Sequence, residues 1–346
     1  MPDPFPAAPV QHSSYIPPTP SAWPPAEEPR AYEYTTFPRA FVSYRWFKPL
    51  LVFLLGFVFL MAFGFVLVGI AATATGSLDF LYTIGTSYDD MDAYTGPGAL
   101  LTLGSVAVML PALALAALIV RDRPYSSYSS SRDGWNWGAF AKCLGVAAVL
   151  MGISLVVETV FFPSGASDGV MRFTVVGFVL CTLLVPFQCV AEEYFFRGWL
   201  MQTVGAWTRL PVLAVLVQAL VFAAMHPYNL IGVATILIDG LAWGVIAWRT
   251  KGLEASSALH IMSNMVAFYF TGLGLDAISS EIDLLTLVLA GITALAYLLI
   301  VLYANSKWGW FDAKKDGAAE FNQKRMQRLA QRTQTPPEEY WQGTLD

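Results

Sequence analysis

Two of the three histidines of this chain, His226 and His260, fall in apolar stretches, and a third apolar stretch carries the pair Glu192-Glu193. A charged residue at the centre of a membrane helix costs about 2.5–3.5 kcal/mol on insertion scales, so ionisable groups there need a reason. Asn264 lies in the same half of the chain. Carboxylates and neutral imidazoles can activate water or bind a metal. We therefore expect hydrolysis of a substrate inside or at the edge of a membrane.

The two adjacent glutamates need not share one role, because neighbouring helix positions point about 100° apart. Arg197 follows Glu193 by four residues, a spacing that suits an ion pair along one helix face. A simpler interpretation is that Glu192-Glu193 marks an interfacial helix end, with Arg197 reaching to lipid headgroups. Both interpretations stay open at this point.

The two histidines also have ordinary explanations when each is taken singly. His226 precedes Pro227, so its helix is expected to end there, and the imidazole could serve as a cap. His260 and Asn264 are four residues apart and face the same way, as they would in a hydrogen bond between membrane helices. These three residues occur in the same half of the chain as the two glutamates, and this combination favours a functional site. Asp239 is an isolated acid that we interpret as structural.

Composition indicates a polytopic membrane protein with an all-α fold. Hydrophobic residues make up 56% of the chain and charged residues 13%, and the mean hydropathy is +0.53. A soluble domain is nearer 25% charged. Crossing the hydrocarbon core takes about 20 apolar residues, which predicts a bundle of about eight transmembrane helices. They are placed near 49–72, 99–120, 139–160, 172–191, 210–226, 230–248, 255–272 and 283–304.

Charge placement predicts the orientation of this bundle, with both termini cytoplasmic. Lys and Arg gather in the N-terminal segment, the second loop, the loops after the fourth and sixth helices and the C-terminal tail. The alternate loops carry Asp and Glu instead, so the positive-inside rule applies. Trp199 and Trp207 lie near a predicted helix end and are interpreted as part of an interfacial aromatic belt. We expect a multi-pass protein of the plasma membrane.

Four regions follow from these patterns. Eleven of the 21 prolines lie within residues 1–38, a composition typical of extended, disordered chain. The Ser- and Tyr-rich loop between the second and third helices is expected to be a flexible cytoplasmic connector. The predicted regions are a disordered tail (1–46), N-terminal helices (47–160) with the flexible loop 121–137, a catalytic membrane domain (161–305) and a charged cytoplasmic tail (306–346).

Three motifs in this chain resemble those of the CPBP intramembrane proteases. They are Glu-Glu-x-x-x-Arg over 192–197, Phe-x-x-x-His over 222–226 and His-x-x-x-Asn over 260–264. That family groups type II CAAX prenyl endopeptidases with bacteriocin-processing and immunity-related membrane proteins. The resemblance covers about 172–272. Each motif alone is weak, but all three in the right order are a specific signal.

The resemblance implies an eight-helix bundle whose site is recessed from the cytoplasmic side. Carried over to this chain, Glu192 and His226 would activate the attacking water. His260 and Asn264 would stabilise the oxyanion or hold a metal, since peptide hydrolysis needs donor or positive groups where negative charge develops. The remaining motif residues, Glu193 and Arg197, would organise the site.

Whether a metal takes part stays open. The family carries a metalloprotease name, and His226, His260 and Glu192 could hold Zn²⁺ or another divalent metal with one coordination position free. The chain has no His-Glu-x-x-His helix. The same residues could work without metal, with a glutamate as base and Asn264 as oxyanion donor.

The predicted function is that of an intramembrane endopeptidase acting near the cytoplasmic half of the membrane. Its substrate would be a membrane-associated or membrane-delivered peptide or protein, and it would contact the lipid bilayer but no nucleic acid. The alternatives are a non-proteolytic scaffold or immunity protein of the same fold and a proton-coupled transporter. Transporters usually show internal repeats, whereas here one half alone carries the polar set.

One geometric condition decides whether these residues can act together. If the fifth helix enters near Leu210, His226 lies about 24 Å along it. Glu192 is expected near the cytoplasmic end of the fourth helix, at a shallower depth. If the carboxylate and the imidazole are too far apart to share a water molecule, the joint mechanism fails.

Overall fold

The structure is a computed structural model of the 346-residue chain. It describes residues 33–78, 92–132, 134–161, 169–276, 278–312, 318–319, 321–324 and 327–328. These residues form helices, with one isolated antiparallel bridge between Ser130 and Gly252. The predicted all-α class is therefore confirmed. The predictions for residues 1–32 and for most of the tail 306–346 lie outside the described residues.

The described helical elements follow one another along the chain. Their bounds are η2 (Tyr34–Ala40), α1 (Lys48–Thr75), α3 (Gly96–Ala107), α4 (Met109–Val120), α5 (Ser126–Ser129), α6 (Trp137–Phe161), α7 (Val175–Glu193), η4 (Tyr194–Met201), α8 (Gln202–Thr208), α9 (Pro211–Ala224), α10 (Leu230–Thr250), α11 (Glu254–Gly272) and α12 (Leu284–Trp308). Here η2 is a 3₁₀-helix and η4 a π-helix.

Six of the described helical stretches are long and apolar enough to cross a membrane. They are α1, α3 with α4, α6, the run from α7 to α8, α10 and α12. The other two expected segments differ: α9 has 14 residues, and the 19-residue α11 begins with polar and charged side chains. The chain is an integral multi-pass membrane protein. The count of eight crossings and the orientation remain predictions.

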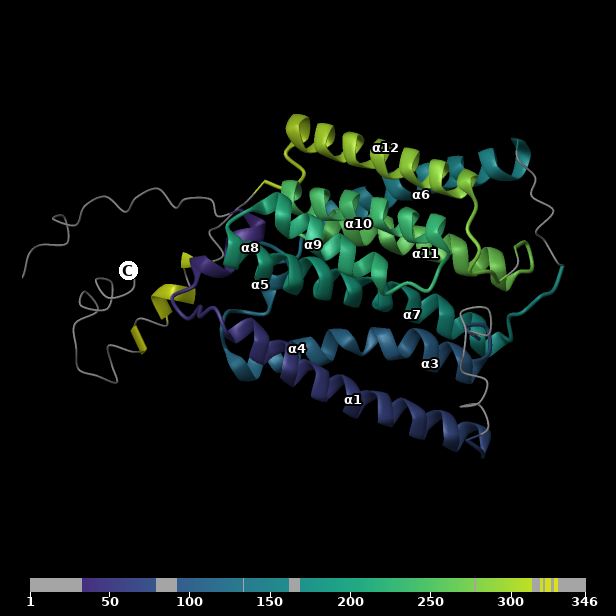
Figure 1. The fold of residues 1–346 in the computed structure, drawn as a ribbon, viewed down its shortest axis with the longest axis horizontal. Helices are drawn as coiled ribbons and strands as arrows, with labels where there is room; N and C mark the ends of the chain where they lie inside the picture. Colours follow the sequence, from purple (N-terminus) through teal and green to yellow (C-terminus); the bar gives the residue numbers. More distant parts are fainter. Residues whose placement is uncertain are drawn as a thin grey trace, which may run out of the picture. The chain divides into compact units, whose positions relative to one another are not determined.

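Helices α7, α10 and α11 lie at the centre of the helical unit (Figure 1). Helix α7 packs against α3 and α11, and α11 packs against α6 and α10. Helix α1 packs on α3 and α4, while α12 packs on α10 and α6. Small side chains allow close approach between these helices. A Cβ added at Gly56 of α1, for example, would lie 3.7 Å from the Cβ of Ala116 in α4.

Large apolar side chains remain exposed on the outer helices. Phe57 and Phe65 of α1 and Leu295 and Leu299 of α12 are among them. In water such a surface would be unfavourable, whereas a lipid environment accommodates it. The backbone groups of these helices are satisfied within each helix, as a hydrocarbon environment requires.

The fourth predicted helix is longer than expected. Helices α7, η4 and α8 form one run of 34 residues, Val175–Thr208, and Glu192 lies inside this run, not at its end. The depth of Glu192 relative to His226 stays a prediction.

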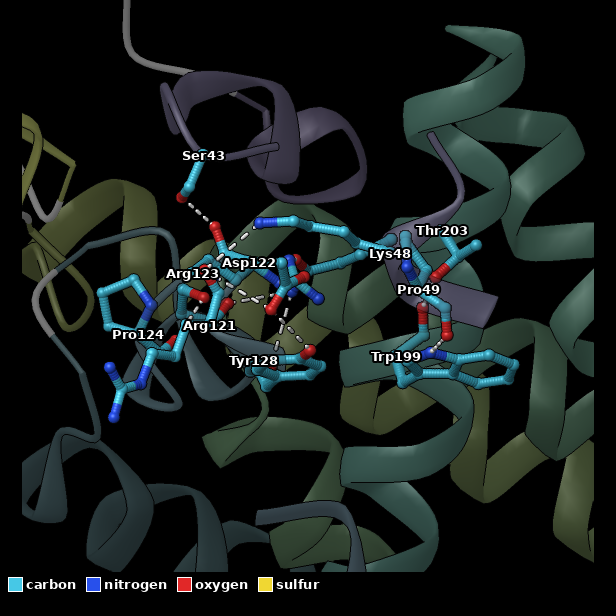
Figure 2. Close-up of polar contacts among 12 residues, drawn as sticks. Ser43, Lys48, Pro49, Arg121, Asp122, Arg123, Pro124, Tyr128, Trp199 and Thr203 are labelled. Atoms are coloured by element: carbon cyan, nitrogen blue, oxygen red, sulfur yellow. Dashed lines mark hydrogen bonds and ion pairs between the residues drawn. The ribbon is translucent and has the colours of Figure 1, made fainter. Parts of the chain in front are cut away.

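The surroundings of Trp199 are those of a packed side chain. Its side chain is 7% exposed, and its indole N–H donates to the carbonyl oxygen of Pro49 at 3.1 Å (Figure 2). The ring also stacks on Phe53 at 5.2 Å between centroids. This tryptophan is therefore a tertiary contact between α1 and η4, and its place in an interfacial belt stays a prediction.

Replacing Trp199 by phenylalanine should lower the free energy of unfolding by about 1 kcal/mol. The substitution keeps an aromatic ring but removes the donor to the buried Pro49 carbonyl. Trp207→Phe is a matched control, because the Trp207 N–H also donates to a carbonyl, that of Trp46, yet its side chain is 42% exposed and water can replace it. Unfolding in detergent measures both. Equal effects of the two substitutions would contradict this interpretation.

Two segments that the sequence predicted to be disordered or flexible are packed in the structure. Of the predicted tail, residues 34–40 form η2, with Tyr34 and Phe37 buried. The Tyr34 hydroxyl donates to the carbonyl oxygen of Tyr128 at 2.5 Å. In the predicted loop 121–137, Asp122, Arg123 and several serines are buried as well. These residues are thus packed against the rest of the protein, whereas the predicted region boundaries and the flexibility of the loop stay predictions.

Buried Asp122 should make stability depend on pH. Burial raises the pKa of this carboxyl above its ordinary value of 3.8, and the neighbouring Arg123 partly opposes the rise. The folded protein then binds the proton more tightly than the unfolded chain, so stability falls as pH rises through the range directly above 3.8.

The substitution Asp122→Asn should flatten this part of the stability profile. Melting temperatures of both proteins between about pH 4 and pH 7 measure it. The variant lacks the Asp122 carboxyl. The melting temperature of the wild type relative to that of the variant should therefore fall as pH rises through this range. Parallel profiles would show that Asp122 is not responsible.

Candidate active site

Glu193, Arg197 and His260 form a buried polar cluster at the contact between α7, η4 and α11. One Glu193 oxygen, Oε1, lies 3.0 Å from Nη1 of Arg197 and 3.0 Å from Nδ1 of His260. Glu193 and Arg197 are 0% exposed and His260 is 2% exposed. The ion pair expected from the four-residue spacing is therefore present. Arg197 does not reach to lipid headgroups, and that alternative is excluded.

Glu192 lies on the other side of the same imidazole. Its Oε2 atom is 3.2 Å from Nε2 of His260, and its side chain is 12% exposed. This oxygen is buried but makes no aligned hydrogen bond within the protein. Glu192 is thus the more accessible of the two glutamates. Glu193 is held in an ion pair with Arg197, and the Oε2 atom of each glutamate makes no aligned hydrogen bond within the described residues.

The helix changes its winding directly after Glu193. Residues Tyr194–Met201 form the π-helix η4, a rare conformation that is frequently found at functional sites. Gly198 lies in this segment, and a Cβ there would come within 2.9 Å of the Tyr128 carbonyl oxygen. The glycine therefore permits close approach of the neighbouring loop. No hydrophobic spacing in the sequence predicts the π-helix.

Two aromatic side chains cover the charged cluster. The Trp243 ring of α10 stacks on His260 at 4.3 Å between centroids. The Arg197 guanidinium lies 4.5 Å from the Phe222 ring centroid and 5.3 Å from that of Trp243. These cation–π contacts stabilise a desolvated cation and exclude water from one side. Neither aromatic was predicted as a site residue, although Phe222 begins the second motif.

His226 lies beyond the end of α9, as Pro227 predicted. Its Nδ1 atom is 2.8 Å from the carbonyl oxygen of Phe222 and must donate to it. Nε2 is then the nitrogen free to accept a proton or orient a ligand. The Phe222 ring contacts both histidines, with centroids 4.7 Å from His226 and 5.9 Å from His260. Among the described residues no hydrogen bond or ion pair joins His226 to Glu192.

Asn264 lies one turn beyond His260 on α11, on the side that faces α7. Its amide Nδ2 donates to Oε1 of Gln188 at the long distance of 3.4 Å. Gln188 is one turn before Glu192, so the two polar pairs follow each other along the α7–α11 contact. Gln188 was missed in the sequence. Its four-residue spacing from Glu192 was the signal that could have found it.

Helix α10 adds a further acceptor beside the cluster. The carbonyl oxygen of Gly240 accepts from Nε2 of Gln218 at 2.8 Å and from Nη2 of Arg197 at 3.5 Å. The neighbouring Asp239 interacts electrostatically with Arg197 and His260. The guanidinium is therefore held from two helices, which fixes it beneath the Phe222 ring.

The predicted metal ligands do not form a coordination set in this arrangement. Within the described part of the chain, no group of three or more His, Cys, Asp or Glu side chains is placed to hold a metal ion. Both ring nitrogens of His260 already face the carboxylates of Glu192 and Glu193, and Nδ1 of His226 faces a carbonyl. We derive no chemistry through a metal.

Apolar helices around a buried glutamate, arginine and histidine define a multi-pass membrane protein with a polar site among its helices. Residues 173–266 match the family model of the Rce1-like, type II CAAX prenyl endopeptidases. This stretch contains all six candidate residues, so the resemblance carried by the three motifs is confirmed. The match covers less than half of the chain.

One curated relative also aligns with this chain. It is the uncharacterized protein YyaK of Bacillus subtilis, which is 26% identical over 172 residues. The alignment covers 46% of this chain and 57% of YyaK, so it spans little more than half the length of that relative. No solved structure matches the chain.

Proposed function

We propose that this protein is an intramembrane endopeptidase that hydrolyses a peptide bond of a membrane-associated or membrane-delivered substrate. The observation that carries the proposal is the placement of Glu192 beside His260. The Glu193–Arg197 pair holds this histidine from its other side. These residues lie in the stretch that matches the endopeptidase family model.

In the proposed reaction Glu192 is the general base. Its side chain is the more exposed of the two glutamates, so it is the carboxylate that a water molecule can reach and that can take a proton from it. His226 orients that water through its free Nε2. The proton then passes to the leaving amine, and the new carboxylate carries the oxygen of the water.

Asn264 is proposed to stabilise the oxyanion as a hydrogen-bond donor, and His260, whose ring nitrogens face the two glutamates, through the positive charge of its ring. They project from one face of α11, one turn apart. The hydrogen bond from Asn264 to Gln188 is long, so this donor can turn to a developing negative charge. Donors fixed in a dry site are effective because they need no reorganisation during the reaction.

Glu193 and Arg197 are proposed to fix His260 in place. A carboxylate that accepts from one imidazole nitrogen orients the ring and sets its tautomer. The arginine neutralises this carboxylate within the buried cluster. The positive groups next to Glu192 thus remain in a constant arrangement while the substrate reacts.

The substitution Asn264→Ala should lower kcat by about 100-fold with little change in KM. The removed amide would interact with the transition state far more than with the bound substrate. Gln188→Ala serves as the matched control, since it removes the partner of Asn264 but no proposed oxyanion donor. Steady-state kinetics on a cleaved peptide measure both. An equal rise in KM for both variants would show that Asn264 only packs the helices.

The substrate class is proposed from the family description and the apolar surroundings of the site. A peptide that ends in a prenylated cysteine motif could bring its bond to a site among membrane helices.

Farnesylated and unmodified versions of one such peptide, presented to the purified protein in liposomes, test this substrate class. Faster cleavage of the farnesylated form supports it, and parallel assays with a chelator test for a metal. Without cleavage of any peptide, the non-proteolytic scaffold becomes the better explanation.

A further inference from the structure

The loop of residues 122–132, which we call the clamp loop, connects α4 to α6 and is largely buried. Figure 2 shows its first part, where Asp122 and Arg123 lie against Tyr128 and the N-terminal segment. The Ser43 hydroxyl donates to the carbonyl oxygen of Asp122. A serine-rich loop with buried charges needs a structural or functional reason, because buried ionic groups are costly unless paired.

The first arm of the clamp loop binds the helix that carries Glu193 and Arg197. Arg123 donates to Oε1 of Gln202 and, through Nη2, to the carbonyl oxygen of Gly198 at 3.3 Å. In return, Nε2 of Gln202 donates to the carbonyl oxygens of Ser127 at 3.2 Å and Tyr128 at 3.4 Å. The loop is therefore joined to η4 and α8 in both directions, one residue from Arg197.

The second arm binds the start of the helix that carries His260. Nη2 of Arg132 lies 2.5 Å from Oε2 of Glu254, the first residue of α11, and both side chains are buried. The other carboxylate oxygen accepts from the backbone N–H of Asn136 at 2.7 Å. The backbone N–H of Leu253 donates to the Ser129 carbonyl at 2.9 Å. Glu254 precedes His260 by six residues.

Glycines at both contact points allow the loop to lie this close. A Cβ at Gly198 would come within 2.9 Å of the Tyr128 carbonyl oxygen. A Cβ at Gly252 would come within 2.4 Å of Nη2 of Arg132 and 2.5 Å of Oε2 of Glu254. Real Cβ atoms do not approach neighbours so closely. Glycine at these two positions thus leaves room for the Tyr128 carbonyl and for the Arg132–Glu254 pair.

We propose that Arg123 and Arg132 are positioning residues of the candidate active site, and this rests on the proposed function. The clamp loop holds η4 and α11 together at one end. It thereby sets the separation between Glu193 on one helix and His260 on the other, which are joined at 3.0 Å. The position of His260 relative to Glu192 follows from this separation. Loosening either arm slows the chemical step and leaves substrate binding unchanged.

A thiol between the two helices reports on their separation without any substrate. Cys189 of α7 is buried and donates to the carbonyl oxygen of His260 at 3.7 Å. Within a Cys143→Ala, Cys181→Ala background, Cys189 is the one remaining thiol of the chain. The rate of its labelling by N-ethylmaleimide then measures how often α7 and α11 separate.

The experiment compares Arg123→Met, Arg132→Met, Arg132→Lys and Arg249→Met in that background. Arg249 is an exposed arginine of α10 and provides the matched control. We expect both methionine variants of the clamp loop to lower kcat about tenfold, leave KM within twofold and speed Cys189 labelling about tenfold, on the order of 1.4 kcal/mol in each case. Arg132→Lys should recover part of both effects, and Arg249→Met should show neither.

Labelling and kcat that stay at the wild-type level in both methionine variants would overturn the proposal. A lower kcat without faster labelling would also overturn it, because the arms would then not set the helix separation. Arg132→Lys keeps the charge and tests the idea if a methionine variant fails to fold. If the wild type cleaves no peptide, the proposed function fails, whereas the labelling still decides whether the clamp loop holds the two helices.

Discussion

Replacing Glu192 by glutamine should lower kcat for peptide cleavage by about 10²- to 10⁴-fold while the protein stays folded. Glutamine has nearly the shape of glutamate but cannot take the proton of the attacking water. The side chain is 12% exposed, and its oxygen beside His260 makes no aligned hydrogen bond within the described residues. Its loss of charge should therefore change stability little.

Variants of two other glutamates are compared with Glu192→Gln, one as a control and one to separate catalysis from stability. Glu158→Gln changes a carboxylate of α6 that, among the described residues, interacts electrostatically with Asp276 and Asp283 and with no candidate site residue, and it should keep wild-type activity. Glu193→Gln leaves the buried Arg197 without its anion, so it should lower the melting temperature, which Glu192→Gln should not. Peptide cleavage and melting, measured on the same preparations, separate the two roles. Full activity of Glu192→Gln would remove this residue as the base.

Replacing Arg197 by methionine should destabilise the protein by about 3–5 kcal/mol. The substitution leaves the Glu193 carboxylate buried and uncompensated, since both side chains are 0% exposed. The guanidinium also contacts Phe222 and the Gly240 carbonyl, so three neighbours lose a partner. The free energy of unfolding in mixed micelles measures the cost.

A double variant separates stability from catalysis at this pair. Removing both charges with Glu193→Leu and Arg197→Met should recover much of the lost stability, because a buried ion pair can often be replaced by apolar side chains of similar volume. Activity should not return, since His260 then lacks the carboxylate that holds its Nδ1 atom. An active double variant would show that the pair serves stability alone.

The sequence predicted those site features that depend on spacing within one helix. Arg197 pairs with Glu193 because four residues make one turn, and His260 and Asn264 share a face for the same reason. The end of α9 near His226 followed from Pro227. The all-α class followed from composition. These features are local, so the order of residues was enough to find them.

Contacts between distant parts of the chain could not be predicted in this way. Trp199 had the appearance of an interfacial residue, yet Pro49 is its hydrogen-bond partner. The clamp loop had the composition of a flexible connector, yet Arg132 pairs with Glu254, 122 residues away. Which helix end lies beside which loop is decided by tertiary packing.

The most direct test of the central proposal is peptide cleavage by the purified protein in liposomes, followed by mass spectrometry in ¹⁸O-labelled water. Farnesylated and unmodified peptides are compared for the wild type, Glu192→Gln and Glu158→Gln. Hydrolysis predicts that the wild type and Glu158→Gln release a product with one ¹⁸O atom in its new carboxylate, and that Glu192→Gln does not. Labelled product from Glu192→Gln at the wild-type rate, or none from the wild type with any peptide, would contradict the proposal.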